Sequence, residues 1–237
     1  MVTEAIILAG GLGTRLRPVV SDLPKPMAPI AGRPFLTYLL QFLEMNGVRR
    51  VVLAVGYRKE TICSFFGSSY GGMKLRYSSE EEPLGTGGGL LQSLAYVDDP
   101  SALVLNGDTF LRLNYQAMAA TLDHQPDAPL VVALRPIENA SRYGAAIVAG
   151  GRIHGFTARG TAGPGLINAG CYLVARDIFQ RYPMPPKFSW EEDFLQSRSP
   201  EVRPIAFECD VPFIDIGIPE SLHEAQTLIP EWISATT

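Results

Sequence analysis

Residues 5–18 read AIILAGGLGTRLRP, and residues 23–27 read LPKPM. An apolar strand therefore leads directly into a glycine-rich loop, and Arg15 and Lys25 follow closely. Glycine has no Cβ atom, so backbone N–H groups of such a loop can approach a polyanion. The prolines on both sides of Lys25 fix φ and stiffen its segment. This combination predicts a nucleoside triphosphate site at the end of the strand.

Two common phosphate-binding loops do not fit this stretch. The P-loop pattern requires Gly, four residues and then Gly-Lys-Ser/Thr, which these residues do not supply. The dinucleotide pattern requires a third glycine three positions after the second, where this chain has Leu16. An ordinary strand–turn–helix junction remains an alternative. The joint presence of three glycines, Arg15 and Lys25 argues against it.

Composition excludes several classes of protein. The 237 residues are 46% hydrophobic and 19% charged, which suits one large α/β domain with a substantial core. A net charge of −4 disfavours a broad nucleic-acid surface. No apolar run reaches membrane-spanning length, and no signal-peptide pattern opens the chain. Three widely spaced cysteines favour a reduced, cytoplasmic protein without a disulfide framework.

Strand and helix patterns alternate along the first half, which predicts a mostly parallel sheet with helices on both faces. Shorter or antiparallel strands follow in the second half. The expected strands are 4–8, 51–55, 75–77, 102–105, 130–134, 145–148, 153–156, 166–174 and 211–216. The expected helices are 35–43, 59–66, 90–96, 115–122 and 219–228, and a capping box at 189–192 opens another short helix.

Two aspartates follow or interrupt apolar stretches. Asp108 ends the run LVLNGD at 103–108, and Asp215 lies between two isoleucines in FIDIG at 213–217. A carboxylate in such surroundings is unfavourable unless it is paired or bound to a cation. Either residue alone is also typical of a turn or a helix cap. Together, in a chain with a triphosphate loop, they predict a Mg²⁺ site, because Mg²⁺ prefers carboxylate, phosphate and water oxygens.

The sequence GGLGTRLRP at 10–18 with LPKP at 23–26 resembles the signature of the sugar-phosphate nucleotidylyltransferases. The resemblance extends from residue 4 to about residue 228. It implies a Rossmann-like nucleotidyltransferase fold of the GT-A type, a three-layer αβα sandwich with a mostly parallel mixed sheet and a small antiparallel element. It also implies a single domain over 1–237, whose nucleotide-binding half is about 1–125 and whose sugar-phosphate-binding half is about 126–237.

The resemblance also implies roles for individual residues. Catalysis falls to Arg15, Lys25 and Asp108, and Mg²⁺ to Asp108 and Asp215. Nucleotide binding falls to two glycine-rich segments, namely Leu8, Ala9, Gly10, Gly11, Gly13, Thr14 and Arg15, and then Leu84, Gly85, Thr86 and Gly88. The second segment also reads as a flexible turn. Sugar-phosphate binding falls to Asn106, Gly144, Arg159, Asn168, Ala169, Gly170 and Glu191.

Two of these residues carry alternatives. Many relatives have Glu-Lys where this chain has Ala158-Arg159, so Arg159 is expected to take over the phosphate contact and one usual sugar contact is in doubt. Glu191 also suits a carboxylate in the first turn of a helix.

No nucleophilic serine or histidine pair stands out, and none is needed. A sugar 1-phosphate with a second pKa near ~6 is already largely deprotonated at neutral pH. The main requirements are positioning and positive charge.

Within the family, the segments around 105–109, 165–170, 188–191 and 213–219 most resemble the guanylyltransferases of D-glycero-α-D-manno-heptose 1-phosphate. That resemblance implies GTP and a heptose 1-phosphate as substrates and GDP-heptose for bacterial capsule or surface-layer glycans as product. Enzymes that transfer guanylyl to mannose 1-phosphate, uridylyl to N-acetylmuramate 1-phosphate or thymidylyl to glucose 1-phosphate remain alternatives. So does a non-catalytic nucleotide-binding subunit. Relatives commonly self-associate, so a homo-oligomer is possible.

Overall fold

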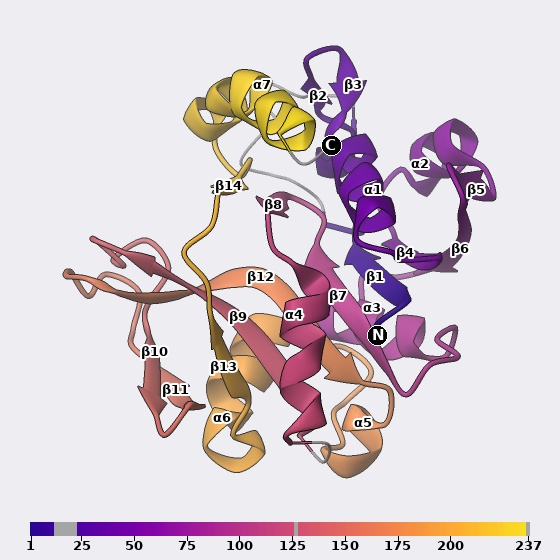
Figure 1. The fold of residues 1–237 in the computed structure, drawn as a ribbon. Helices are drawn as coiled ribbons and strands as arrows, with labels where there is room; N and C mark the ends of the chain where they lie inside the picture. Colours follow the sequence, from indigo (N-terminus) through magenta and orange to yellow (C-terminus); the bar gives the residue numbers. More distant parts are fainter. Residues whose placement is uncertain (12–22, 126–127, 236–237) are drawn as a thin grey trace.

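The computed structural model describes residues 1–11, 23–125 and 128–235. Its main feature is one ten-stranded sheet in the order β10-β11-β13-β9-β12-β7-β1-β4-β6-β5 (Figure 1). Gly13, Thr14 and Arg15, which the sequence assigns to the nucleotide, lie outside the described residues. Within the described ranges, each helix is too short or too polar to cross a bilayer.

The first half of the chain builds a parallel block. Its strands are β1 (Glu4–Leu8), β4 (Arg50–Val55), β6 (Met73–Ser79) and β7 (Ser101–Asn106), paired in parallel in the order β6-β4-β1-β7. The short β5 (Ser69–Tyr70) closes one edge in antiparallel fashion. Apolar runs on β1, β4 and β7 are buried on both faces, as a covered parallel sheet requires. All four strands therefore end at the same edge.

The second half extends this sheet. Antiparallel β12 (Gly165–Ala175) pairs with β7 on one side and with β9 (Leu130–Ile137) on the other. Beyond β9 follow β13 (Ile205–Glu208), β11 (Arg152–Phe156) and β10 (Ala146–Ala149). The strands that the sequence marks as shorter or antiparallel thus share the main sheet with the parallel block.

Helices cover both faces, which confirms the three-layer α/β fold. Successive β1 residues point to opposite sides, so Ile7 packs into one core cluster and Ile6 into the other. The first cluster lies under α1 (Phe35–Met45), α2 (Lys59–Phe66), α4 (Tyr115–Ala119) and α7 (Pro219–Ser234). The second lies under α3 (Gly85–Leu94), α5 (Ile178–Arg181), η4 (Trp190–Gln196) and α6 (Ser197–Val202).

Small elements complete the fold. A two-stranded antiparallel ladder joins β8 (Thr109–Leu111) to β14 (Phe213–Asp215), and a second joins β2 (Pro29–Ile30) to β3 (Arg33–Pro34). Single 3₁₀ turns form η2 (Lys25–Met27) and η3 (Ala120–Asp123). The first ladder matters most, because its register places Asp215 opposite Thr109 and so beside Asp108.

Most expected elements are present, but β13, α5 and α6 were not predicted from the sequence. The strand expected at 211–216 spans only Phe213–Asp215, and the helix expected at 115–122 ends at Ala119 and continues as η3. Two further boundaries differ for identifiable physical reasons. The helix expected at 90–96 begins at Gly85, because the backbone N–H of Gly87 donates to Phe188 and fixes the glycine run in place. The C-terminal helix continues past 228 to Ser234, because Ile229 and Ile233 extend its buried stripe.

The capping box at Ser189 is partly as predicted. Its Oγ accepts from the N–H of Glu192 at 3.2 Å. The Ser189 N–H in turn donates to Asp193 Oδ2 at 2.7 Å rather than to Glu192. This one-residue shift follows from the wider π-type winding of η4.

Candidate active site

Two cavities open where the parallel strands end. The larger, of about 560 Å³, lies at the ends of β1, β4 and β7 and extends to α3 and η4. The smaller, of about 160 Å³, lies between β12, β14 and the loops of the second half. Among the described residues, the two cavities share three lining residues, namely Asn106, Asp108 and Glu191. Two ligands bound in these cavities would therefore meet at the end of β7.

Most residues expected at the nucleotide line the larger cavity. These are Leu8, Ala9, Gly10, Gly11, Lys25, Gly85 and Thr86. The end of β1 is fixed against its neighbours, because Gly107 N–H donates to Leu8 O at 3.0 Å and Ala9 N–H donates to Ala54 O at 2.8 Å. The first glycine loop thus leaves the sheet between β4 and β7.

The second glycine segment is held by a neighbouring loop. Phe188 donates its N–H to Leu84 O and accepts from the Gly87 N–H, each at 3.0 Å. Leu84 and Gly88, which the sequence assigns to the nucleotide, are not among the residues that line the cavity. Gly88 is buried against Pro186. The structure therefore places these two in the framework of the segment.

A chain of alternating charges joins the two cavities. Lys25 Nζ hydrogen-bonds Oδ2 of Asp108 and lies 3.8 Å from Oδ1 of Asp215. Arg142 Nη2 donates to the other oxygen of Asp215 at 3.1 Å. Gly217 N–H donates to Asp215 Oδ1 at 2.7 Å and fixes the carboxylate. The predicted carboxylate pair is thus assembled, with Lys25 between its members.

Glu191 is a half-buried acid between the cavities. Its Oε1 accepts from Asn106 Nδ2 at 3.2 Å and from Asn168 Nδ2 at 3.4 Å. Burial raises the pKa of Glu191, and the nearby Asp108 adds to the rise, whereas the Asn106 hydrogen bond and the Arg159 charge oppose it. The amides hold this carboxylate where it can accept from a ligand in either cavity.

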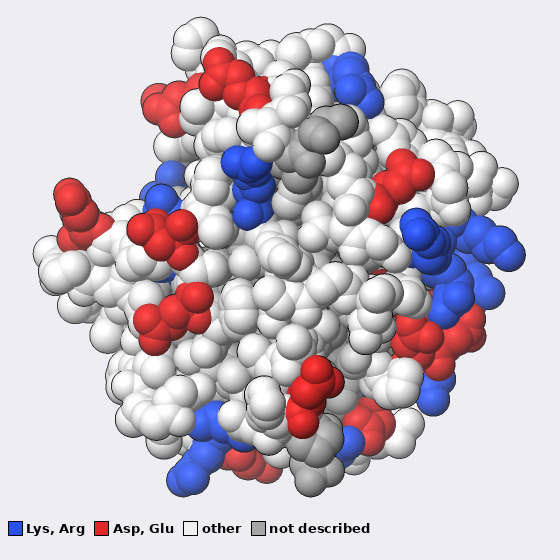
Figure 2. Space-filling model, in the orientation of Figure 1, with Lys and Arg blue, Asp and Glu red and all other residues white. Residues whose placement is uncertain are grey.

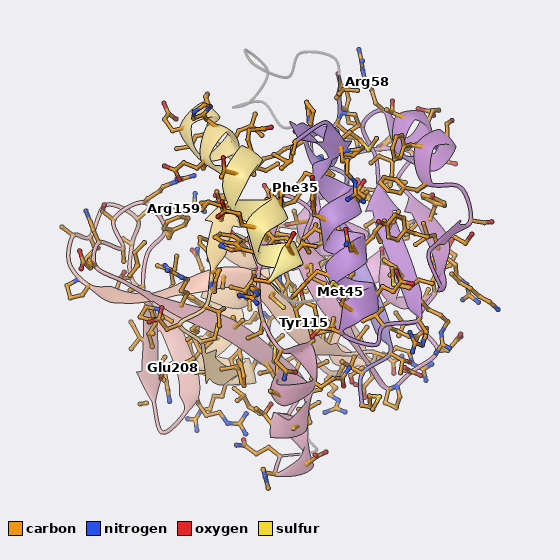
Figure 3. The ribbon with its side chains drawn as sticks, turned by 45° about the horizontal axis from the view of Figure 1, so that its top comes forward. Phe35, Met45, Arg58, Tyr115, Arg159 and Glu208 are labelled. Carbon is orange, nitrogen blue, oxygen red and sulfur yellow. The ribbon has the colours of Figure 1, made fainter. Side chains whose placement is uncertain are left out.

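The remaining expected sugar-phosphate residues gather at the smaller cavity. Arg159, Asn168, Ala169 and Gly170 line it, whereas Gly144 supports the adjoining loop beside Thr157. Arg159 Nη2 lies 3.9 Å from Glu191 Oε2. Arg159 belongs to the part of the molecule built by the second half of the chain (Figure 3). Basic and acidic groups are interspersed over the face shown in Figure 2.

Comparison with known proteins identifies the family. The family model described as "Nucleotidyl transferase" matches residues 4–231. The chain belongs to the nucleotidyl transferase family. This confirms the family predicted from the glycine-loop signature and, with it, the predicted class of enzyme.

This nucleotidyl transferase has relatives of nearly its own length. It is 40% identical to the D-glycero-alpha-D-manno-heptose 1-phosphate guanylyltransferase of Aneurinibacillus thermoaerophilus, over 97% of this chain and 100% of the relative. It is also 40% identical to the protein of that name from Campylobacter jejuni subsp. jejuni, over 93% and 97%. HddC from Yersinia pseudotuberculosis, solved in complex with GMP-PN, superposes with a TM-score of 0.81 at 36% identity, covering 94% of this chain and 98% of HddC.

Two charged residues at the cavities of this nucleotidyl transferase were not predicted from the sequence. Glu80 lines the larger cavity, and burial raises its pKa, although its Oε2 accepts from the Leu84 N–H at 3.0 Å. It is the first of three consecutive glutamates, so only its position after β6 could have marked it. Arg142 lines the smaller cavity and lies two residues before Gly144, which was expected at the sugar phosphate.

The carboxylates of this nucleotidyl transferase suit a metal that is completed by substrate. Within residues 1–11, 23–125 and 128–235, no three acidic, histidine or cysteine side chains cluster as a metal site. Asp108 and Asp215 offer oxygen atoms on either side of one ammonium group. Two carboxylates plus phosphate oxygens and water form a donor set that Mg²⁺ accepts.

Proposed function

We propose that this enzyme transfers GMP from GTP to D-glycero-α-D-manno-heptose 1-phosphate, giving GDP-heptose and pyrophosphate. The observation that carries the proposal is the meeting of the two cavities at Asn106, Asp108 and Glu191. A triphosphate in the larger cavity and a sugar phosphate in the smaller one would bring their phosphates together there.

Glu80 supports guanine as the base. An ionised carboxylate only accepts hydrogen bonds. The Watson–Crick edge of guanine presents two adjacent donors, N1–H and the N2 amino group. Uracil and thymine present a single N3–H between two carbonyl oxygens, which a carboxylate repels. Glu80 is half-buried in the larger cavity, with its Oε1 beside Gly10 and Gly89, so a base without a donor there would leave that oxygen without a hydrogen bond.

The relatives support heptose 1-phosphate as the acceptor. Two proteins that match nearly the full length of this chain at 40% identity bear the name D-glycero-alpha-D-manno-heptose 1-phosphate guanylyltransferase. Asn106, Asn168 and Glu191 offer both donors and acceptors to sugar hydroxyls in the smaller cavity.

The chemistry is an in-line displacement. A phosphate oxygen of the sugar 1-phosphate attacks the α-phosphorus of GTP and forms a new P–O bond. The bond between the α-phosphorus and the α,β-bridging oxygen breaks, and its electrons leave with pyrophosphate. No base is required because the attacking oxygen, with a pKa near ~6, is already ionised at neutral pH. Lys25 would hold the phosphates near the reacting centre, and Arg15 would hold the pyrophosphate.

Asp108 and Asp215 would hold Mg²⁺ with the help of phosphate oxygens. When bound, such an ion neutralises the phosphates and stabilises charge in the transition state. Lys25 and Arg142 now occupy these carboxylates and would have to release them for both to hold the ion.

A substrate matrix tests the proposal. Pyrophosphate release is measured with Mg²⁺, four nucleoside triphosphates and the 1-phosphates of heptose, mannose, glucose and N-acetylmuramate. We expect the GTP and heptose pair to give the highest kcat/KM. Preference for UTP or dTTP would contradict the assignment of the base, and preference for another sugar would contradict that of the acceptor. Inactivity with every pair would favour a nucleotide-binding subunit.

A further inference from the structure

Two arginine-bearing loops are joined beside the smaller cavity. One loop precedes β10 and carries Arg142, and the other follows β11 and carries Arg159. Gly160 N–H donates to Ser141 O at 2.7 Å, so a backbone bond joins the loops one residue from each arginine. Such a connection holds the two side chains at a fixed separation along the cavity wall.

A second contact fixes the same arrangement at Gly144. Thr157 N–H donates to Ala145 O at 2.8 Å, and Ala145 N–H donates to Thr157 Oγ1 at 2.9 Å. Gly144 has φ +81°, and a Cβ atom there would lie 2.6 Å from Thr157 O. Only glycine suits this close approach. The loops therefore form one rigid support for both guanidinium groups.

Arg142 is held without being enclosed. Its guanidinium lies 5.1 Å from the centre of the Tyr143 ring and bonds to Asp215 at 3.1 Å. Its side chain remains 38% exposed. The Tyr143 ring packs edge-on against Phe213, so the surface beneath the guanidinium is itself fixed. The group can exchange one oxygen partner for another nearby without losing its aromatic contact.

The charges of the smaller cavity require a second cation. Among the described residues that line it, three are acidic, namely Asp108, Asp215 and Glu191. Two are basic, namely Arg142 and Arg159. A sugar phosphate adds up to two further negative charges. Lys25 pairs with Asp108 from the side of the larger cavity. If Arg159 were the only cation of the smaller cavity to bind the phosphate, Asp215 and Glu191 would still repel that phosphate at short range.

We propose that Arg142 binds the phosphate of the sugar 1-phosphate together with Arg159, exchanging its bond to Asp215 for one to substrate. The inference rests on the proposed function and adds a specificity-determining residue to it. Guanidinium groups match phosphate through paired N–H donors, which a lysine cannot reproduce. The exchange also frees Asp215 at the moment when the acceptor phosphate arrives.

Steady-state kinetics of Arg142→Gln tests the proposal. We expect the KM for the sugar 1-phosphate to rise roughly 10- to 100-fold, the range for loss of a hydrogen bond to a charged group, with the KM for the nucleotide unchanged. The KM of Arg142→Lys for the sugar 1-phosphate should lie between those of Arg142→Gln and the wild type. Arg198→Gln, which removes an arginine from a surface ion pair with Glu201, is the matched control and should change neither KM.

Competition by inorganic phosphate supplies a second readout. At saturating nucleotide, phosphate should inhibit Arg142→Gln less than the wild type against the sugar 1-phosphate. An unchanged sugar-phosphate KM, or an equal rise in both KM values, would show the proposal to be wrong. Wild-type inactivity with every substrate pair would refute the proposed function instead. In that case calorimetric binding of mannose 1-phosphate to wild type and Arg142→Gln still decides the role of Arg142, because equal affinities would exclude it.

Discussion

Lys25 and Asp108 are bonded side chain to side chain although 83 positions separate them in the chain. Lys25 is only 13% exposed, and its Nζ is also 3.8 Å from Asp215. An ammonium group placed between two carboxylates at the junction of two cavities would lie within reach of a substrate phosphate if Asp108 and Asp215 held Mg²⁺. In the absence of substrate, Lys25 and the two aspartates, which the proposed mechanism uses, therefore neutralise one another.

Replacing Lys25 with alanine should lower kcat about 100- to 1000-fold, as expected for removal of one preorganised donor to the transition state. Pyrophosphate release at saturating substrates gives the rate, and circular dichroism checks the fold. Lys74→Ala, which alters an exposed lysine on β6, should leave kcat unchanged. Undiminished turnover in a correctly folded Lys25→Ala variant would show that catalysis does not require Lys25.

Asp108→Asn should raise the Mg²⁺ concentration needed for half-maximal activity, because an amide lacks the charge that attracts the ion. Roughly tenfold or more is expected for a direct ligand, since even outer-sphere partners are worth about 10- to 100-fold in metal affinity. The control is Asp177→Asn, which alters an acid paired with Arg181 on the surface. A titration identical to that of the wild type would exclude Asp108 as a ligand. Chelation of divalent ions should abolish turnover in the wild type.

The sequence pattern predicted those parts of the site that lie at the carboxyl ends of strands. The carboxyl ends of β1 and β7 lie side by side, so the first glycine loop and Asp108 meet as expected. Asp215 follows a different rule, since the β8–β14 ladder brings it to Asp108 from more than 100 residues away. Its apolar neighbours indicated a buried position, but its partner strand could not be read from them.

The residues that sequence reasoning missed depend on tertiary pairing. Arg142 reaches the site because two loops are joined through Ser141 and Gly160, a contact without local periodicity. Glu80 differs from the next two glutamates only in burial, and burial follows from the packing of α3 against the sheet. Such features need the assembled fold, whereas glycine runs and strand ends do not.

Glu80→Gln should weaken the preference for GTP. A neutral amide accepts less strongly from guanine and can donate to a carbonyl oxygen of uracil. The ratio of kcat/KM for GTP to that for UTP should fall by about 10-fold or more, the range for a lost charged hydrogen bond. Glu82→Gln, two residues away and exposed, is the matched control. An unaltered ratio would mean that Glu80 does not read the base.

Gly88→Ala should destabilise the fold although alanine is the better helix former by about 1 kcal/mol. A Cβ atom at Gly88 would overlap the carbonyl oxygen of Pro186 and lie 2.7 Å from Leu84 Cβ. Overpacking of this kind costs about 1–3 kcal/mol, measurable by urea unfolding. In Gly155→Ala the new atom would lie 3.9 Å from Ile147 Cδ1, an ordinary contact, so stability should hold. Equal stability of the two variants would contradict the packing role of Gly88.

Glu191→Gln should make the protein more stable at neutral pH but less active. Burial raises the pKa of Glu191 in the folded state, so ionisation is less favourable there than in the unfolded chain. Below the unfolded pKa of about 4.3 both states are protonated and the carboxyl has no such effect. Between the unfolded and the folded pKa, ionisation of Glu191 lowers the free energy of unfolding progressively as the pH rises. Above the folded pKa this destabilisation stays constant.

The gain in Tm of Glu191→Gln over the wild type should therefore be near zero at about pH 4 and positive at pH 7. Asp108 adds to the effect and Arg159 opposes it, so both must be left intact in the comparison. Thermal unfolding at several pH values measures the difference, with Glu192→Gln on the exposed side of η4 as control. A Tm gain that is the same at both pH values would indicate a packing effect. A loss at pH 7 would mean that bonds from Asn106 and Asn168 to the ionised oxygen outweigh burial.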